Sequence, residues 1–303
     1  WTVVSPIVFT YRVIQCKDLL DRRNDTLLWG HTEHQELKGT TSNSTPVKRF
    51  VVIDKTVHEL YGSKISQYFY AKGVMYKILP VPTTEENKNM ELVTKILEEV
   101  HQFGIDIRSE LIIALGGGVC FDVVGLAASL YRRRTPYVRM ALMKHPVLFE
   151  LLEVNGRKML HAKLQPSETW GGSEQEDGAA ASVRIAIETM LEELAPNLWE
   201  DDLDWLLDFG HIMSPELEMR VLPALLHGEA DSIGMSFMVY VAHQKGLLTT
   251  QEKSRIIQCM LGVELPVWHQ ECSLVLVQKS FRERLRHSAG SLRMPLPTGL
   301  GRA

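Results

Sequence analysis

Three consecutive glycines, Gly116, Gly117 and Gly118, interrupt two apolar runs in the segment IIALGGGVCFDVVG. Glycine lets bare backbone approach a ligand, and the N-terminus of a following helix offers unpaired N–H groups with partial positive charge. The glycines therefore predict a pyrophosphate site, and Asp122, one turn further on, is placed to meet a sugar hydroxyl. The segment is neither a GxGxxG motif nor a P-loop, so a tight strand-to-helix turn with a solvated acid remains the alternative.

Two other sets of polar residues follow predicted strands. Asp54 ends the run RFVVID, a position where dinucleotide-binding folds often place the partner of a ribose hydroxyl. The alternative for Asp54 is the N-cap of the next helix. Glu85 and Lys88 follow LPVP and stand one helical turn apart, so both can face a ribose or can form a surface ion pair.

His211 and His227 precede two successive predicted helices, in DFGHIMSPELEM and LLHGEADSIGM. Histidines at the entrances of consecutive helices can converge on one metal ion. A catalytic metal site normally has three protein ligands and an open position, so two histidines leave the set incomplete. A structural role is the alternative for this pair, and it is our interpretation of His31, His34, His58 and His101.

The first half of the chain alternates short apolar runs with helical patterns. This alternation indicates an α/β fold with a parallel sheet covered on both faces. The segment 21–46 is polar and is expected to be a long loop. Strands are expected at 8–15, 49–54, 74–82 and 110–118, and helices at 56–73, 83–104 (with Thr84 as N-cap) and 120–134.

Helical periodicity dominates the second half of the chain. A polar, glycine-rich loop is expected at 163–180. We therefore expect an α/β domain over 1–139 and an all-helical domain over 140–303. Helices are expected at 140–154, 180–195, 214–226, 229–246, 249–262 and 273–287.

The composition excludes several classes of partner. The formal net charge is −4, which disfavours a general binder of nucleic acid or anionic membranes. No apolar run is long enough to span a bilayer, and the first residues do not have the pattern of a secretory signal. The four cysteines are scattered, which fits a reducing compartment. A cytoplasmic protein is expected.

Several segments, taken together and in order, resemble the sugar phosphate cyclases of the dehydroquinate synthase superfamily. They are IIALGGGVCFDVVGLAASLYRRRTPYVR, DFGH with SPELE, HGEA, and MPLPTGLG, and they are most similar to animal 2-epi-5-epi-valiolone synthases. The resemblance implies a Rossmann-like N-terminal domain over 1–139 that binds NAD and a helical C-terminal domain over 140–303 for metal and substrate. It also implies zinc or cobalt as the metal, a phosphorylated sugar as the substrate, and a homodimer.

The same resemblance implies roles for individual residues. NAD would be bound by an acid after the second strand, an acid-x-x-Lys pair and the glycine loop with its following acid. The metal would be bound by a glutamate and two histidines. No catalytic residue is assigned. The matching residues are Asp54, Glu85, Lys88, Gly116, Gly117, Gly118 and Asp122 for NAD, and His211 and His227 for the metal.

Two departures distinguish the subfamilies. Dehydroquinate synthases carry an arginine, suited to a substrate carboxylate, where this chain has Asp204, and a second histidine where it has Pro215. Both differences resemble the valiolone synthases, whose substrate is sedoheptulose 7-phosphate.

The resemblance also implies that a segment is missing after Arg139, where TPYVR joins MALMKH directly. In the family that segment supplies threonines that contact NAD, lysines that bind the substrate phosphate, and the metal-binding glutamate, with which Pro136 aligns. We therefore expect weak metal retention, unless Glu229 or Glu150 replaces the ligand, and no turnover. The alternatives are an inactive NAD-binding remnant and an iron-type polyol dehydrogenase, which shares the glycine loop and paired histidines.

Overall fold

The protein divides into two units, Trp1–Met140 and Ala141–Ala303, which are described separately. The computed structural model describes residues 18–30, 47–106, 110–131, 146–161, 178–195, 209–287 and 294–302, together with residues 2, 12–14, 16 and 292. Asp204, Pro136, the junction of Arg139 with Met140, and residues 163–177 of the expected loop lie outside these ranges.

The first unit is built on a parallel sheet whose described strands have the order β2-β1-β3. These strands are β1 (Lys48–Asp54), β2 (Met75–Val81) and β3 (Ile112–Leu115). In the register, Val52 of β1 pairs with Leu79 on one side and Ala114 on the other. The predicted parallel sheet is therefore confirmed, and the carboxyl ends of its strands lie along one edge.

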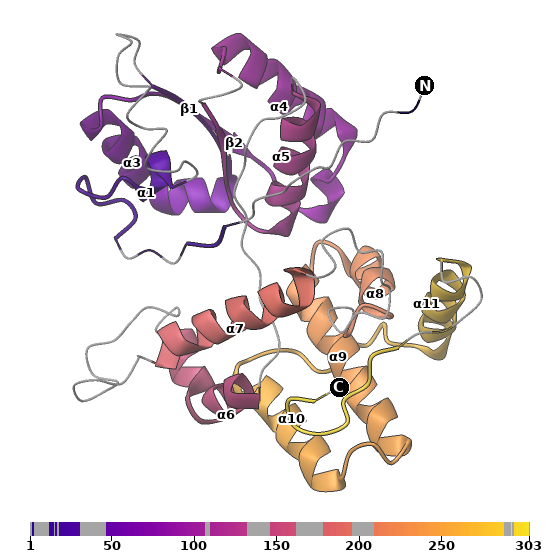
Figure 1. The fold of residues 1–303 in the computed structure, drawn as a ribbon. Coiled ribbons are helices and arrows are strands. Elements are labelled where there is room, and N and C mark those ends of the chain that lie inside the picture. The colour runs from indigo at the N-terminus through magenta and orange to yellow at the C-terminus, as the bar shows by residue number, and fades with distance from the viewer. Residues whose placement is uncertain are drawn as a thin grey trace, which may run out of the picture. The chain divides into compact units, whose positions relative to one another are not determined.

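Alternate residues of β1 point into two different cores, as the period of a strand requires. Phe50 and Val52 pack with residues of α4 (Met90–Phe103) and α5 (Gly118–Leu130). Val51 and Ile53 pack with residues of α1 (Thr26–Trp29) and α3 (Lys55–Ala71). Figure 1 shows these helix pairs on opposite faces of the sheet. Because both faces are covered, β1 is apolar throughout its centre.

The helix expected over 83–104 is interrupted. A 3₁₀ turn, η1 (Glu85–Asn87), comes first, and α4 begins only at Met90. The Thr84 side chain makes no capping hydrogen bond. The Asn89 side chain is the cap instead, because its oxygen accepts from the Leu92 N–H at 3.0 Å.

The long loop expected over 21–46 contains a short helix, α1. Its last residues are held against the sheet by Arg49, which is fully buried and donates to the Leu28 carbonyl at 2.7 Å. The Arg49 guanidinium also lies 5.1 Å from the Trp29 ring centroid. Of the strand expected over 8–15, the structure describes only residues 12–14, and these form no strand.

Helices make up all the regular elements described in the second unit, apart from an isolated bridge between Gly299 and Arg302. Val239, Ala242 and Leu248 form one of its buried clusters. Among the described residues, no helix has the length and apolar character needed to cross a membrane. The helices are α6 (Pro146–His161), α7 (Gly178–Leu194), α8 (Ser214–Val221), α9 (His227–Gln244), α10 (Thr250–Gly262) and α11 (Leu274–His287).

Candidate functional site

Two helix entrances bring the predicted histidines together in the second unit. His227 is the first residue of α9, and His211 lies in the turn that leads into α8. Their ring centroids are 5.7 Å apart and their planes are inclined by 73°. The convergence expected from the sequence is therefore present.

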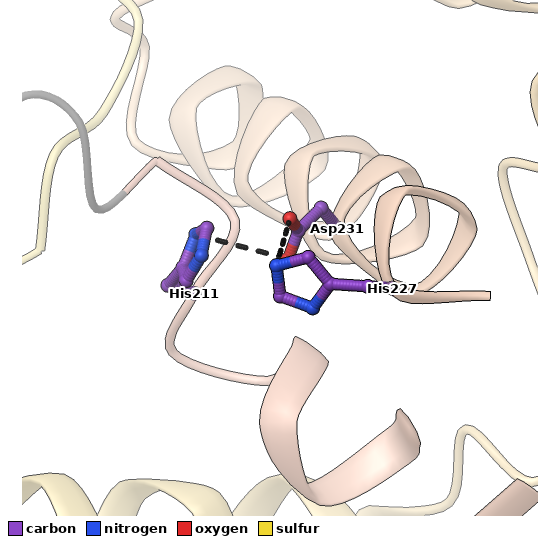
Figure 2. Close-up of side chains that lie close together, drawn as sticks. All are labelled: His211, His227 and Asp231. Carbon is purple, nitrogen blue, oxygen red and sulfur yellow. Dashed lines mark ion pairs between the residues drawn. The ribbon is translucent and has the colours of Figure 1, made fainter. Parts of the chain in front are cut away.

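An aspartate that was not predicted completes the cluster. Asp231 stands four residues after His227 and therefore lies on the same face of α9. Its carboxylate forms an ion pair with each ring (Figure 2): Oδ2 is 3.3 Å from Nε2 of His227, and Oδ1 is 3.7 Å from Nδ1 of His211. We name His211, His227 and Asp231 the histidine–aspartate cluster.

Two atoms of this cluster are buried without a hydrogen-bond partner among the described residues. They are Nδ1 of His211 and Oδ1 of Asp231. Their separation of 3.7 Å is too long for a hydrogen bond. Buried polar atoms are nearly always satisfied in folded proteins, so such a pair indicates an additional bound group.

Glu218 of α8 orients one of the rings. Its Oε2 lies 2.8 Å from Nδ1 of His227, and its side chain is only 7% exposed. A carboxylate at this nitrogen favours a proton on Nδ1, which leaves the Nε2 lone pair directed to the side where Asp231 lies. Histidines that bind metals usually have such a partner on their second nitrogen.

The donor set fits a divalent transition metal. One ligand atom from each of His211, His227 and Asp231 lies within 4.8 Å of the others. Imidazole and carboxylate are the ligands that zinc and similar metals take in proteins. The sequence contained a signal for Asp231, because positions i and i+4 share a helix face. It contained no comparable signal for Glu218, which lies nine residues before His227 on a different helix, α8.

Of the two replacement ligands considered from the sequence, Glu229 does not join this cluster. Glu229 is occupied at the start of α9, where its Oε2 accepts from the Leu226 N–H at 2.8 Å. The side chain of Glu150 lies outside what the structure describes.

The glycine loop lies in the first unit, at the carboxyl end of β3. Gly117 is the N-cap of α5, and no side chain caps that helix. A Cβ atom on Gly117 or Gly118 would meet none of the described residues within 4 Å, which leaves the backbone there open to a ligand on the side that the structure describes. A Cβ on Gly116 would lie 2.7 Å from Cβ of Cys120. Close packing therefore explains Gly116, whereas Gly117 and Gly118 fit a ligand-binding loop.

Asp54 is the N-cap of α3, which confirms the alternative considered for it. Its Oδ1 accepts from the N–H groups of Thr56 and Val57, and its Oδ2 accepts from the Thr83 hydroxyl at 2.5 Å. Burial of the carboxyl raises its pKa, but the hydrogen bonds from Thr83, Val57 and Thr56 outweigh this and hold the pKa below its usual value. The ionised side chain lies at the same sheet edge as the glycine loop.

Lys88 connects two of the predicted nucleotide-binding acids. Its Nζ lies 3.0 Å from Oδ2 of Asp122 and 3.9 Å from Oε2 of Glu85. The ion pair considered for Glu85 and Lys88 is thus present, and Asp122 is its stronger partner. The three side chains join the start of α5 to the 3₁₀ turn after β2.

Two family models match this chain. The 3-dehydroquinate synthase N-terminal model matches residues 78–143, and the C-terminal model matches residues 136–286. The two matches overlap over residues 136–143, which include the junction where a missing segment is expected.

Curated relatives extend the match over the whole chain. A 2-epi-5-epi-valiolone synthase of an Actinomyces species is 34% identical over 365 residues, covering 100% of this chain and 92% of the relative. Because this chain has only 303 residues, the alignment includes positions where the relative has residues and this chain has none. A 3-dehydroquinate synthase of Streptococcus sanguinis is 25% identical, covering 85% of this chain and 86% of the relative.

A solved structure has the same fold. It is a 2-epi-5-epi-valiolone synthase from Streptomyces hygroscopicus subsp. jinggangensis 5008 with NAD+ and Zn2+ bound. The TM-score is 0.83 at 31% identity, and the match covers 99% of this chain and 93% of the other. The expected architecture, a Rossmann-like domain followed by a helical domain, is confirmed.

Proposed function

The chain belongs to the 3-dehydroquinate synthase family, and from this premise we propose that it is a sugar phosphate cyclase of the 2-epi-5-epi-valiolone synthase type. The observation that supports this most strongly is the 34% identity over the full chain to such a synthase. Family membership also favours a cyclase over the polyol dehydrogenase alternative. The reaction would release phosphate from sedoheptulose 7-phosphate and close the carbon ring.

NAD would bind at the carboxyl edge of the sheet in the first unit. Gly117 and Gly118 leave room for the pyrophosphate beside the N–H groups that begin α5. Asp122 and Glu85, both held by Lys88, offer carboxylates for ribose hydroxyls. Asp54 lies at the same edge, although both of its oxygens already accept hydrogen bonds within the protein. Gly116 has a packing role in the turn between β3 and α5, because a Cβ atom there would collide with Cys120.

A divalent metal, zinc or cobalt, would bind at His211 and His227. The buried Nδ1 of His211, which has no partner among the described residues, is the feature of this structure that fits such an ion. Glu218 would hold the proton on Nδ1 of His227, so that Nε2 remains a ligand atom. When bound, NAD supplies reversible hydride transfer and the metal polarises the oxygen of the reacting carbon.

Pro215 supports the choice of a sugar phosphate that has no carboxylate over a keto acid phosphate. It stands in the first turn of α8, four residues after His211, and carries no group that could pair with a carboxylate. Asp204 would repel a carboxylate, although its position lies outside the described residues. A repaired chain with the relatives' segment restored after Arg139 should cyclise sedoheptulose 7-phosphate to 2-epi-5-epi-valiolone. A product formed only from the seven-carbon keto acid phosphate of the shikimate route would contradict this proposal.

The 303-residue chain itself should bind its cofactors without turnover. The resemblance assigns the phosphate-binding lysines to the missing segment, and loss of even one positioned donor typically slows such chemistry about a hundredfold or more. We therefore propose that this chain keeps the NAD and metal sites of a cyclase of this type without its turnover, and that a chain that contains the segment catalyses the reaction.

The family resemblance also predicts a homodimer, which light scattering of the purified chain can test.

A further inference from the structure

We propose that Asp231 is the third metal ligand in this chain, in place of the glutamate that relatives carry in the segment missing here. The inference rests on the proposed metal site at His211 and His227 and adds a residue to it. It replaces the expectation of a metal held by two histidines alone.

The spacing of the three side chains fits tetrahedral coordination. Two ligand atoms about 2.0–2.1 Å from zinc, at a tetrahedral angle, lie roughly 3.3 Å apart. The distance from Oδ2 of Asp231 to Nε2 of His227 is 3.3 Å, and that from Oδ1 to Nδ1 of His211 is 3.7 Å. Small side-chain rotations would suffice to place one ion in contact with all three residues.

The polar atoms of the cluster lack a better explanation within the described part of the chain. A salt bridge between His227 and Asp231 would account for Oδ2, but it leaves Oδ1 of Asp231 and Nδ1 of His211 buried and unsatisfied. A buried polar atom that nothing pairs with destabilises the folded state. A cation between them would satisfy both at once.

The composition of the set also fits. Two imidazoles and one carboxylate, with a fourth position open, are a common arrangement for catalytic zinc. Asp231 is 19% exposed and His227 is 53% exposed, so the cluster is accessible on one side. Glu218 is assigned to the orientation of His227, because its Oε2 lies 2.8 Å from Nδ1 of that ring, although its Oε1 is also buried without a partner among the described residues.

Cobalt binding to the metal-stripped 303-residue chain tests the assignment. The parent is compared with Asp231→Asn, which is nearly isosteric, and with Glu271→Gln. Glu271 is a matched control because it is an acid of the same unit that pairs with Arg220, outside the cluster. Calorimetry gives affinity and stoichiometry, the visible cobalt spectrum reports ligand geometry, and thermal unfolding is recorded with and without cobalt.

We expect the parent and Glu271→Gln to bind one equivalent of cobalt with the same spectrum. Asp231→Asn should bind more than about tenfold more weakly, because loss of a direct ligand should cost at least as much as loss of an outer-shell partner. Its metal-free unfolding temperature should not fall, whereas the cobalt-induced rise should be lost. A purely structural Asp231 would give the opposite pattern, with a lower metal-free unfolding temperature and unchanged cobalt affinity.

Two outcomes separate this inference from the proposed function. If Asp231→Asn binds cobalt as the parent does, Asp231 is not a ligand and the site at the two histidines stands. If the parent binds no cobalt but the chain with the restored segment does, Asp231 has not replaced the glutamate, and the cyclase assignment still stands. If neither chain binds cobalt, both the inference and the proposed metal site fall.

Discussion

The carbonyl oxygen of Gly210 lies 2.2 Å from the position that a Cβ atom on Gly234 would occupy. Backbone therefore packs directly on backbone where the turn before α8 crosses α9. Gly210 also has φ of 99°, a conformation that favours glycine. This contact places His211, the next residue, beside the turn of α9 that carries Asp231.

Gly234→Ala should disrupt this arrangement. The new methyl group cannot fit without moving the Gly210 turn, and overpacking of this kind typically costs about 1–3 kcal/mol. Cobalt affinity should fall together with the free energy of unfolding measured in urea. Gly228→Ala, in the first turn of the same helix, is the control because its Cβ would meet nothing within 4 Å. Equal behaviour of the two variants would show that the contact does not position His211.

Glu218→Gln tests whether the buried carboxylate tunes His227. The amide can still accept the hydrogen bond at Nδ1 but carries no charge, so the imidazole should become a poorer ligand. We expect cobalt affinity to fall about tenfold while the stoichiometry remains one. Unchanged affinity, measured by calorimetry, would reduce Glu218 to a packing role.

The sequence predicted most of this framework because its signals are local. Strand β1, the glycine turn and both histidines stand in short patterns that reveal their elements directly. Asp231 was missed because its role depends on His211, which lies on another element. The 3₁₀ turn before α4 was missed because Thr84 and Asn89 are both plausible caps, and only the packed structure selects Asn89.

Asp54 has a structural role that can be measured apart from any role with NAD. Asp54→Ala should lower the free energy of unfolding by about 1 kcal/mol, because it removes a helix cap, whereas Asp54→Asn should retain most of the cap. The folded-state pKa is depressed, so the ionised carboxyl stabilises the fold above its unfolded pKa of about 3.9.

This contribution should disappear as the pH falls through the folded-state pKa. The difference in stability between the parent and Asp54→Ala should therefore be larger at about pH 6 than at about pH 3. Urea unfolding at both pH values measures it. A difference that grows on acidification would contradict the hydrogen-bonded, ionised cap. If NAD affinity falls in Asp54→Asn while stability does not, the carboxylate also contacts the ribose.

Gly117→Val should abolish NAD binding and leave the fold intact. The backbone of Gly117 has φ of −89°, which any residue can adopt, and its Cβ position is open in the protein. A branched side chain would therefore obstruct only a ligand that approaches this loop. Gly262→Val, at another open glycine, is the control. If calorimetry shows that Gly117→Val binds NAD with the parent's affinity, the glycine loop is not part of the NAD site.

A segment missing after Arg139 remains a prediction of the family resemblance. There TPYVR joins MALMKH directly. The alignment with the Actinomyces relative spans 365 residues, more than the 303 residues of this chain, which is consistent with this prediction. The junction lies outside the described residues.

Phosphate release from sedoheptulose 7-phosphate, with NAD and cobalt present, tests the central claim most directly. The 303-residue chain is compared with a chain in which the corresponding segment of the Actinomyces synthase is inserted between Arg139 and Met140. The account predicts background release from the first chain and sustained release, with 2-epi-5-epi-valiolone as product, from the second. Robust phosphate release from the 303-residue chain would contradict it.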